Sequence, residues 1–238
     1  GVGKTTTAVN LAASLAEAKQ RVLLLDFDPQ GNAGSGIGVR EEEISIYRIL
    51  SGEFPIEKGI VREVLENLDF IAADRNLSAM DAELAEEENK NFLLKEVLEN
   101  IQKDYDYIFI DCPPSLGTLT VNALTASHSV LIPIQCEYYA LEGLSQLLKN
   151  IQMIQKHLNS NLEISTILLT MYDGRTNLAY QVAEEVREHF PQETLQTKIP
   201  RSVRISEAPS YQQTVISYDP TSTGAQAYRE AAQEIARR

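Results

Sequence analysis

Short, continuously apolar segments alternate along this chain with longer segments in which apolar residues recur every three or four positions. A continuous run, such as residues 22–25, is typical of a parallel strand buried on both faces, whereas the longer spacing is typical of amphipathic helices. These patterns predict strands at residues 21–26, 68–72, 107–111, 129–134, 164–171 and 195–199. They predict helices at residues 5–19, 44–50, 76–103, 141–158, 178–190 and 218–238.

This alternation predicts a single α/β domain over residues 1–238, with a mostly parallel sheet flanked by helices on both faces. Asp219 is expected to cap the last helix, because Pro220 then takes its first position. Residues 27–38 contain Pro29 and several glycines, so we expect a loop there.

Composition narrows the class of protein. The 238 residues are 43% apolar and 23% charged, which excludes a disordered chain, and no apolar run approaches the roughly 20 residues that span a bilayer. The two cysteines lack a disulfide-framework spacing and are expected to be reduced thiols of a cytosolic protein. The net charge of −13 excludes a generically basic nucleic-acid binder, but residues 40–110 hold 8 basic and 18 acidic side chains, or −10 of it. A DNA-facing surface elsewhere is compatible with this distribution.

The first six residues have the pattern of a phosphate-binding Walker A loop, Gly1-Val2-Gly3-Lys4-Thr5-Thr6. Glycines let backbone N–H groups turn toward phosphate, and the following helix adds the positive end of its dipole. Lys4 is expected to bridge the β- and γ-phosphates, and the Thr5 hydroxyl to bind Mg²⁺. Such a loop normally follows a buried strand, so we expect the domain to lack its first strand here and to be incomplete at the N-terminus.

Two aspartates are candidates for the chemistry. Asp111 closes an apolar strand, where the Walker B acid of a nucleotide-binding site lies, and is expected to hold Mg²⁺ through water. Asp28 follows another strand end in a glycine-rich loop, where a carboxylate can orient the attacking water. Either side chain could instead cap a turn, and the pattern does not choose between the two roles.

Other reactive side chains are less informative. Cys112 and Cys136 flank strand ends and are expected to be buried apolar residues, and the three histidines show no ligand spacing. Lys198, Arg201 and Arg204 form a basic stretch, and Arg175 follows a predicted strand. On charge alone, these basic residues are either solvated surface or a contact for DNA.

Several ordered motifs make the chain similar to the ParA/Soj family of partition ATPases over essentially its whole length. They are GVGKTTTAVNL at 1–11, DFDPQGN at 26–32, FIDCPPSLG at 109–117, QCEYYALEGL at 135–144, LTMYDGRTNL at 169–178, IPRSVRISEAPS at 199–210 and YDP at 218–220. The resemblance implies a P-loop ATP hydrolase with ATP and Mg²⁺ as cofactors, whose activity is weak until a ParB/Spo0J-like centromere-binding partner stimulates it. It further implies an ATP-dependent homodimer that binds DNA non-specifically and is cytoplasmic, nucleoid-associated and not bound to membrane.

The resemblance also implies roles for individual residues. Residues 1–6 contact phosphates, Thr5 binds Mg²⁺ and Asp28 positions the hydrolytic water. Arg175 and Arg204 match family positions implicated in DNA binding. The adenine-side Pro-x-Asn of the family appears here as Pro200-Arg201-Ser202, so the base contact has a serine hydroxyl in place of an amide. The signature lysine of the family would lie two residues before Gly1.

Three alternatives stay open. A MinD-like division-site ATPase has the same fold but anchors to membrane through a basic amphipathic tail, and from Gly224 onward the sizeable apolar residues are Tyr228 and Ile235. A nitrogenase-iron-protein-like electron carrier needs cysteines that hold a cluster, and Cys112 lies beside the expected Walker B acid. An inactive, truncated ATPase is the third alternative.

Overall fold

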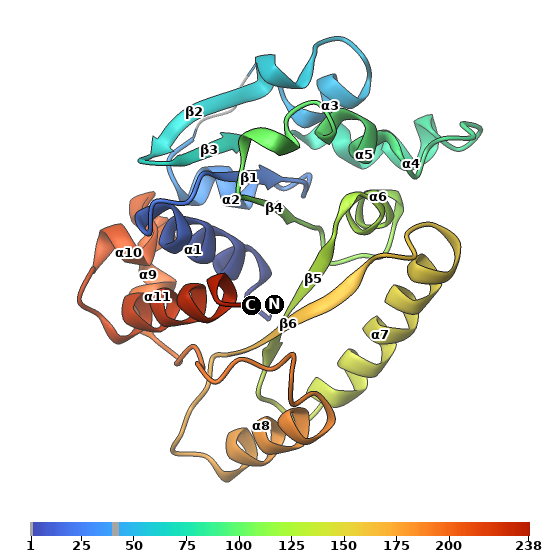
Figure 1. Ribbon diagram of the computed structural model, residues 1–238. Coiled ribbons are helices and arrows are strands. Elements are labelled where there is room, and N and C mark those ends of the chain that lie inside the picture. The colour runs from blue at the N-terminus through green and yellow to red at the C-terminus, as the bar shows by residue number, and fades with distance from the viewer. Residues whose placement is uncertain (1, 40–42) are drawn as a thin grey trace.

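The computed structural model describes residues 2–39 and 43–238 and has the predicted α/β fold (Figure 1). One sheet has the strand order β2 (Ile60–Leu65), β3 (Leu68–Ile71), β1 (Val22–Asp26) and β4 (Tyr107–Asp111). β3, β1 and β4 are parallel, and β2 pairs antiparallel to β3 at the edge. A second sheet pairs β5 (Ser129–Gln135) with β6 (Glu163–Thr170) in parallel.

The core explains why β1 has no polar residue before its closing aspartate. Val22 and Leu24 belong to a cluster shared with α1 (Lys4–Glu17) and α11 (Thr223–Ala236) on one face of the sheet. Leu23 and Leu25 belong to a cluster on the other face, shared with α3 (Ile46–Leu50), α5 (Leu93–Leu98) and α6 (Thr118–Ala126). All four side chains are fully buried, so a polar residue here would lose hydration without a partner.

Helices α7 (Ala140–His157) and α8 (Asn177–His189) lie beside β5 and β6 and form a third cluster with them (Figure 1). Helix α1 contacts both sheets, since it packs on β1, β3, β4 and β5. The N-terminus of α1 therefore lies near the carboxyl ends of strands from both sheets, the place where parallel α/β proteins bind ligands.

Near the end of the chain, one predicted strand is wrong, and the predicted last helix is present but begins at Thr223 with Ser222, not Asp219, as its cap. Residues 195–199 do not form a strand; they join β6 only through backbone hydrogen bonds flanked by isolated bridges at Thr194 and Pro200. The Glu234 carboxylate accepts from the amide groups of Gln196 and Thr197 and so interrupts the ladder. The last helix begins at Thr223, capped by Ser222, because a separate turn, α10 (Val215–Tyr218), precedes it.

Three further differences concern the first half of the chain. The stretch 76–103 is broken into η2 (Arg75–Ala79), α4 (Met80–Glu83), α5 and η3 (Gln102–Asp104), and the side chain of Asn122 binds the backbone of Lys90 and Leu94 where α5 begins. The strand β2, preceded by η1 (Ile56–Gly59), was not predicted. The expected loop 27–38 contains a short helix, α2 (Asn32–Gly36).

Candidate active site

The phosphate loop leads directly into α1. Gly3 precedes the helix with φ of +87°, a left-handed conformation that suits glycine. The Thr170 hydroxyl, at the end of β6, donates to the Val2 carbonyl at 2.8 Å and holds the loop against that strand. Within α1, the first turn carries no acidic residue and its N-terminus has no side-chain cap, so N–H groups and the helix dipole face a possible anion. The predicted phosphate ligand Gly1 lies outside the described residues.

Thr5 and Asp111 meet at the beginning of α1. The Thr5 hydroxyl donates to Asp111 Oδ2 at 2.7 Å, although the two residues are 106 positions apart in sequence. Asp111 ends β4 and is only 2% exposed. A hydroxyl and a carboxylate oxygen are the oxygen ligands that Mg²⁺ accepts, so this pair fits a magnesium ion.

The carboxyl groups beside Thr5 have raised pKa values. Burial raises the pKa of Asp111 to about 7, helped by the charges of Asp26 and Asp28, while the Thr5 hydrogen bond and the charge of Lys4 oppose the shift. Asp26 pairs with Asp111 in the strand register, and burial raises its pKa to about 6. Buried carboxyl groups with raised pKa values mark this place as a candidate functional site.

Asp28 lies in the loop between β1 and α2. Its Oδ1 accepts from the Gln30 amide at 3.0 Å, its carbonyl accepts from the Gly31 amide at 2.9 Å, and its side chain is 8% exposed. This turn fixes the carboxylate near Asp111. Within the described part of the chain, Oδ2 of Asp28 makes no hydrogen bond, so an acceptor is available for water.

A small pocket of about 40 Å³ opens beside Thr5 and Thr6. Its other lining residues come from α1, α2 and the segment that contains η4 (Ala208–Tyr211): they are Val9, Asn10, Asn32, Gly36, Ala208, Pro209 and Gln213. This volume holds about one water molecule, not a purine. These residues were not predicted from the sequence as part of a site, although Ala208 and Pro209 lie inside the motif IPRSVRISEAPS at 199–210.

Pro200 and Ser202, the predicted adenine-side residues, lie one segment earlier. Pro200 bridges to Tyr172, next to the end of β6. Ser202 precedes α9 (Val203–Glu207), and its hydroxyl accepts from the Ile205 amide. The Ser202 side chain is therefore occupied as an N-cap in this conformation.

Both predicted DNA-binding arginines form ion pairs. Arg175 binds the Asp173 carboxylate through Nε at 2.8 Å and Nη2 at 2.7 Å, and this pairing lowers the pKa of Asp173 to about 2. Arg204 pairs with Glu207 at 3.3 Å and with Asp219 at 3.2 Å.

Two further cations lie near Arg175. Lys198 Nζ lies 4.2 Å from the ring centroid of Tyr172. The charge of Arg201 also lowers the pKa of Asp173, so Arg201 lies near the Arg175 pair. The structure thus gathers Arg175, Lys198 and Arg201 around residues 172–173.

The cysteines are poor ligands here. Burial raises the pKa of Cys112 to about 12, with the Asp111 charge adding to the shift. Burial also raises the pKa of Cys136 to about 11. Cys136 is buried, as expected, whereas Cys112 is partly exposed, and both thiols are free.

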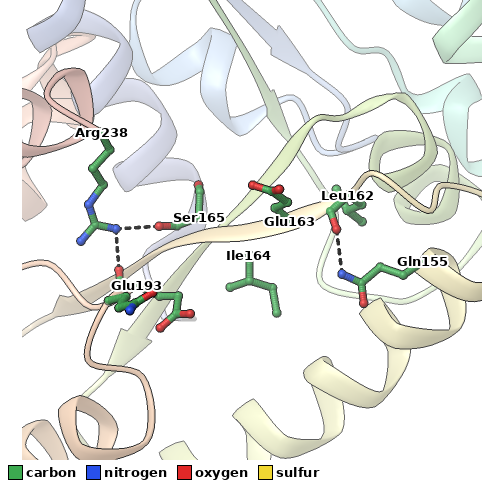
Figure 2. A pocket seen from close by; sticks show the side chains of 8 residues that line it. Gln155, Leu162, Glu163, Ile164, Ser165, Glu193 and Arg238 are labelled. Carbon is green, nitrogen blue, oxygen red and sulfur yellow. Dashed lines mark hydrogen bonds between the residues drawn. The ribbon is translucent and has the colours of Figure 1, made fainter.

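A larger groove of about 530 Å³ lies at the beginning of β6, away from the phosphate loop (Figure 2). Arg238 crosses one side and donates to the carbonyl groups of Ser165 and Glu193. Glu163 and Glu193 line the groove and repel phosphate, so the groove is no candidate for a nucleotide.

None of the described helices is long and apolar enough to span a membrane.

The family described as "AAA domain" matches residues 1–164 of this chain. The chain is 53% identical to the sporulation initiation inhibitor protein Soj of Bacillus subtilis, over 99% of this chain and 94% of that protein. It is 49% identical to the chromosome partitioning protein ParA of Myxococcus xanthus, over 100% of this chain and 85% of that protein.

A solved structure of cobyrinic acid a,c-diamide synthase from Mycobacterium smegmatis, with bound ADP and magnesium, is 35% identical and covers 100% of this chain and 90% of that one, with a TM-score of 0.87. The matches to Soj and ParA cover 99% and 100% of this chain, so the strand ends and loops that build the site lie within the matched range. The chain therefore belongs to the ParA/Soj family of chromosome-partitioning ATPases.

Proposed function

We propose that the protein hydrolyses ATP at the site formed by the phosphate loop, Asp28 and Asp111. The observation that carries this proposal is the hydrogen bond between Thr5 and Asp111 beneath the uncapped N-terminus of α1. Val2, Gly3 and Thr6 contribute backbone N–H groups to the phosphates, as Gly1 is expected to do, and Lys4 neutralises charge on the β- and γ-phosphates. Thr5 and Asp111 hold Mg²⁺, which when bound neutralises charge that develops on the phosphate oxygens.

Asp28 has the separate role of orienting the attacking water. Its carboxylate has one oxygen fixed by the Gln30 amide and one without a protein partner in the described chain, which suits a group that must hold water in a defined place. On the adenine side, Pro200 and Ser202 approach the base. The pocket of about 40 Å³ beside Thr6 is too small for a purine, and Pro200 and Ser202 do not line it.

We further propose that ATP binding produces a homodimer that binds DNA without sequence preference through Arg175 and Arg204. A dimer doubles the number of phosphate contacts, which matters for a chain with a net charge of −13. In this proposal a ParB/Spo0J-like partner stimulates an otherwise weak hydrolysis, and the protein is cytoplasmic and nucleoid-associated. Its proposed biological role is partition of DNA.

The MinD-like alternative requires an apolar helix face that is available to a membrane. In α11, Tyr228 is 2% exposed and the alanines at 225, 227, 231 and 232 are buried against the core. This packing favours the partition proposal. Sedimentation with anionic liposomes and ATP tests the alternative, because a MinD-like protein sediments with them.

The nucleotide site is tested with Lys4→Ala. We expect it to abolish binding of a fluorescent ATP analogue, because Lys4 is the cation that the loop directs at the phosphates. Unchanged affinity in the titration contradicts the assignment of the loop.

The DNA surface is tested with Arg204→Glu, with Lys103→Glu as the control. Lys103 is exposed before β4, at the opposite end of that strand from Asp111, and its substitution changes the net charge equally. We expect Arg204→Glu to lose non-specific DNA binding in a mobility shift while keeping ATP-dependent dimerisation in size-exclusion chromatography. Equal shifts for both variants across a salt series would show that Arg204 is merely solvated surface.

A further inference from the structure

Asp26 is a fully buried carboxylate whose role no motif explains. It ends β1, and its two oxygens accept from three backbone amides of the segment that follows. Oδ1 accepts from the Asp28 amide at 3.2 Å, and Oδ2 accepts from the amides of Ala33 at 3.1 Å and Gly34 at 3.3 Å. The carboxylate thus ties both ends of the Asp28 loop to the end of β1.

We propose that Asp26 is a positioning residue for hydrolysis: through these three amides it holds the loop 27–34 so that the Asp28 carboxylate keeps its place beside Asp111. This inference rests on the proposed role of Asp28. In this role Asp26 acts through the backbone amides of Asp28, Ala33 and Gly34.

The cost of burying Asp26 supports a specific role. A buried carboxylate is expensive unless hydrogen bonds compensate it, and in the described part of the chain all of its hydrogen-bond partners are backbone amides. Leu24, on the same face of β1 as Asp26, is fully buried among apolar side chains. The carboxylate is useful because it alone offers acceptors to amides from both ends of the loop.

The packing of α2 on the sheet is a second observation that supports the anchoring of this loop. A Cβ atom on Gly34 would lie 3.2 Å from Cζ of Phe70, which is fully buried in β3. A side chain at residue 34 would require Phe70 or α2 to shift by a few tenths of an ångström, so glycine favours the close approach of the Gly34 amide to the sheet and to Asp26. The short helix is therefore held by the Asp26 oxygens on one side and by close packing on Phe70 on the other.

The test compares Asp26→Asn with a matched control, Asp69→Asn. Asp69 also accepts a backbone amide, that of Glu63, but it lies on β3 and binds Tyr105 and Arg62. In Asp26→Asn an NH₂ group faces at least one loop amide, so two donors oppose each other. We expect kcat for ATP to fall about tenfold to a hundredfold with KM changed less than about threefold, because hydrogen bonds to charged acceptors are lost while the phosphate loop stays intact. Amide hydrogen exchange in residues 27–36 should accelerate at least about tenfold, whereas Asp69→Asn changes neither quantity.

Two companion variants make every outcome decisive. Gly34→Ala keeps Asp26 but places a Cβ atom 3.2 Å from Cζ of Phe70, so it should shift α2 slightly, lower kcat and accelerate exchange in residues 27–36, both by less than Asp26→Asn does. It is the test that remains if Asp26→Asn fails to fold, and unchanged kcat and exchange in it would then overturn the inference. Asp28→Ala tests the proposed function itself: if it keeps normal turnover, the role of Asp28 is wrong, and the exchange measurement alone then judges the anchoring by Asp26. If Asp28→Ala is inactive, wild-type kcat in Asp26→Asn overturns the inference, and so does a loss of kcat without faster exchange.

Discussion

Replacing Asp111 with asparagine should make the nucleotide-free protein more stable at neutral pH while removing its magnesium ligand. The reason is the raised pKa of the carboxyl group, which moves from 3.8 to about 7 because the charged form is desolvated beside Asp26 and Asp28. The native state therefore holds a proton that the unfolded chain has released. Stability from this group is complete below pH 4 and is lost as the pH rises to about 7.

The magnitude follows from the same shift. Between pH 5.5 and 7 the unfolded chain has released this proton while native Asp111 still largely holds it, and at 1.36 kcal/mol per pH unit for a whole proton this lowers the free energy of unfolding by about 2 kcal/mol. Asp26, with a pKa of about 6, removes less than about 1 kcal/mol more over this range. Four other carboxyl groups have lowered pKa values and lose their stabilising effect only at more acidic pH: Glu17, Asp106, Asp173 and Glu234. The two cysteines titrate only at more alkaline pH.

The assay is urea unfolding without nucleotide and with a chelator, from pH 5.5 to 8. We expect the wild-type free energy of unfolding to fall by about 2–3 kcal/mol over this range and that of Asp111→Asn by less than about 1 kcal/mol. The control is Asp106→Asn: Arg21 holds the pKa of that exposed carboxyl low, so its slope should match wild type. Parallel curves for wild type and Asp111→Asn, or a wild-type stability that rises with pH, would refute the electrostatic account.

Two further variants test the surroundings of the arginines. Asp173→Asn keeps the turn but frees Arg175 from its bidentate partner, so DNA affinity should increase and the salt dependence in fluorescence anisotropy should steepen by about 0.9 per released arginine; an unchanged slope contradicts a role for Arg175. Gly224→Ala places a Cβ atom 2.6 Å from Cγ1 of Ile205, between α11 and α9, and should cost about 1–3 kcal/mol in urea unfolding, a result that wild-type stability would disprove.

Elements with a regular pattern of apolar residues could be predicted from the sequence. The strands β1 and β4 were found because each is a continuous apolar run that ends in aspartate, and the helices α7 and α8 were found because their apolar residues recur every three or four positions. The edge strand β2 was missed because it has polar residues in its middle, Arg62 and Glu63, and Glu63 takes a positive φ of 50° where the register shifts. The range 195–199 has the composition of a strand, but Glu234, far along the chain, takes the amides that a ladder needs.

In the candidate site, too, features that depend on a local sequence pattern could be predicted and contacts between distant segments could not. Thr5, Asp28 and Asp111 could be predicted because a loop and two strand ends are local patterns, and the structure brings Thr5 and Asp111 into contact. The role of Asp26 could not be predicted, because it depends on α2 folding back onto the strand end. The ion pair of Arg204 with Asp219 could not be predicted either, since it requires α9 to lie beside residue 219.

The structure also gives a physical reason why nucleotide and DNA binding could be linked. Asn10 donates from Nδ2 to the Thr6 carbonyl at 2.9 Å and accepts at Oδ1 from the Val215 amide at 2.9 Å, so it joins the beginning of α1 to the segment that follows η4. The same segment lines the small pocket beside Thr6, and it is continuous with α9, which carries Arg204. The Arg204 ion pairs with Glu207 and Asp219 and the pocket beside Thr6 thus belong to one stretch of chain. Under the proposed function, a shift of residues 208–213 on nucleotide binding would therefore reach the arginine that is proposed to bind DNA.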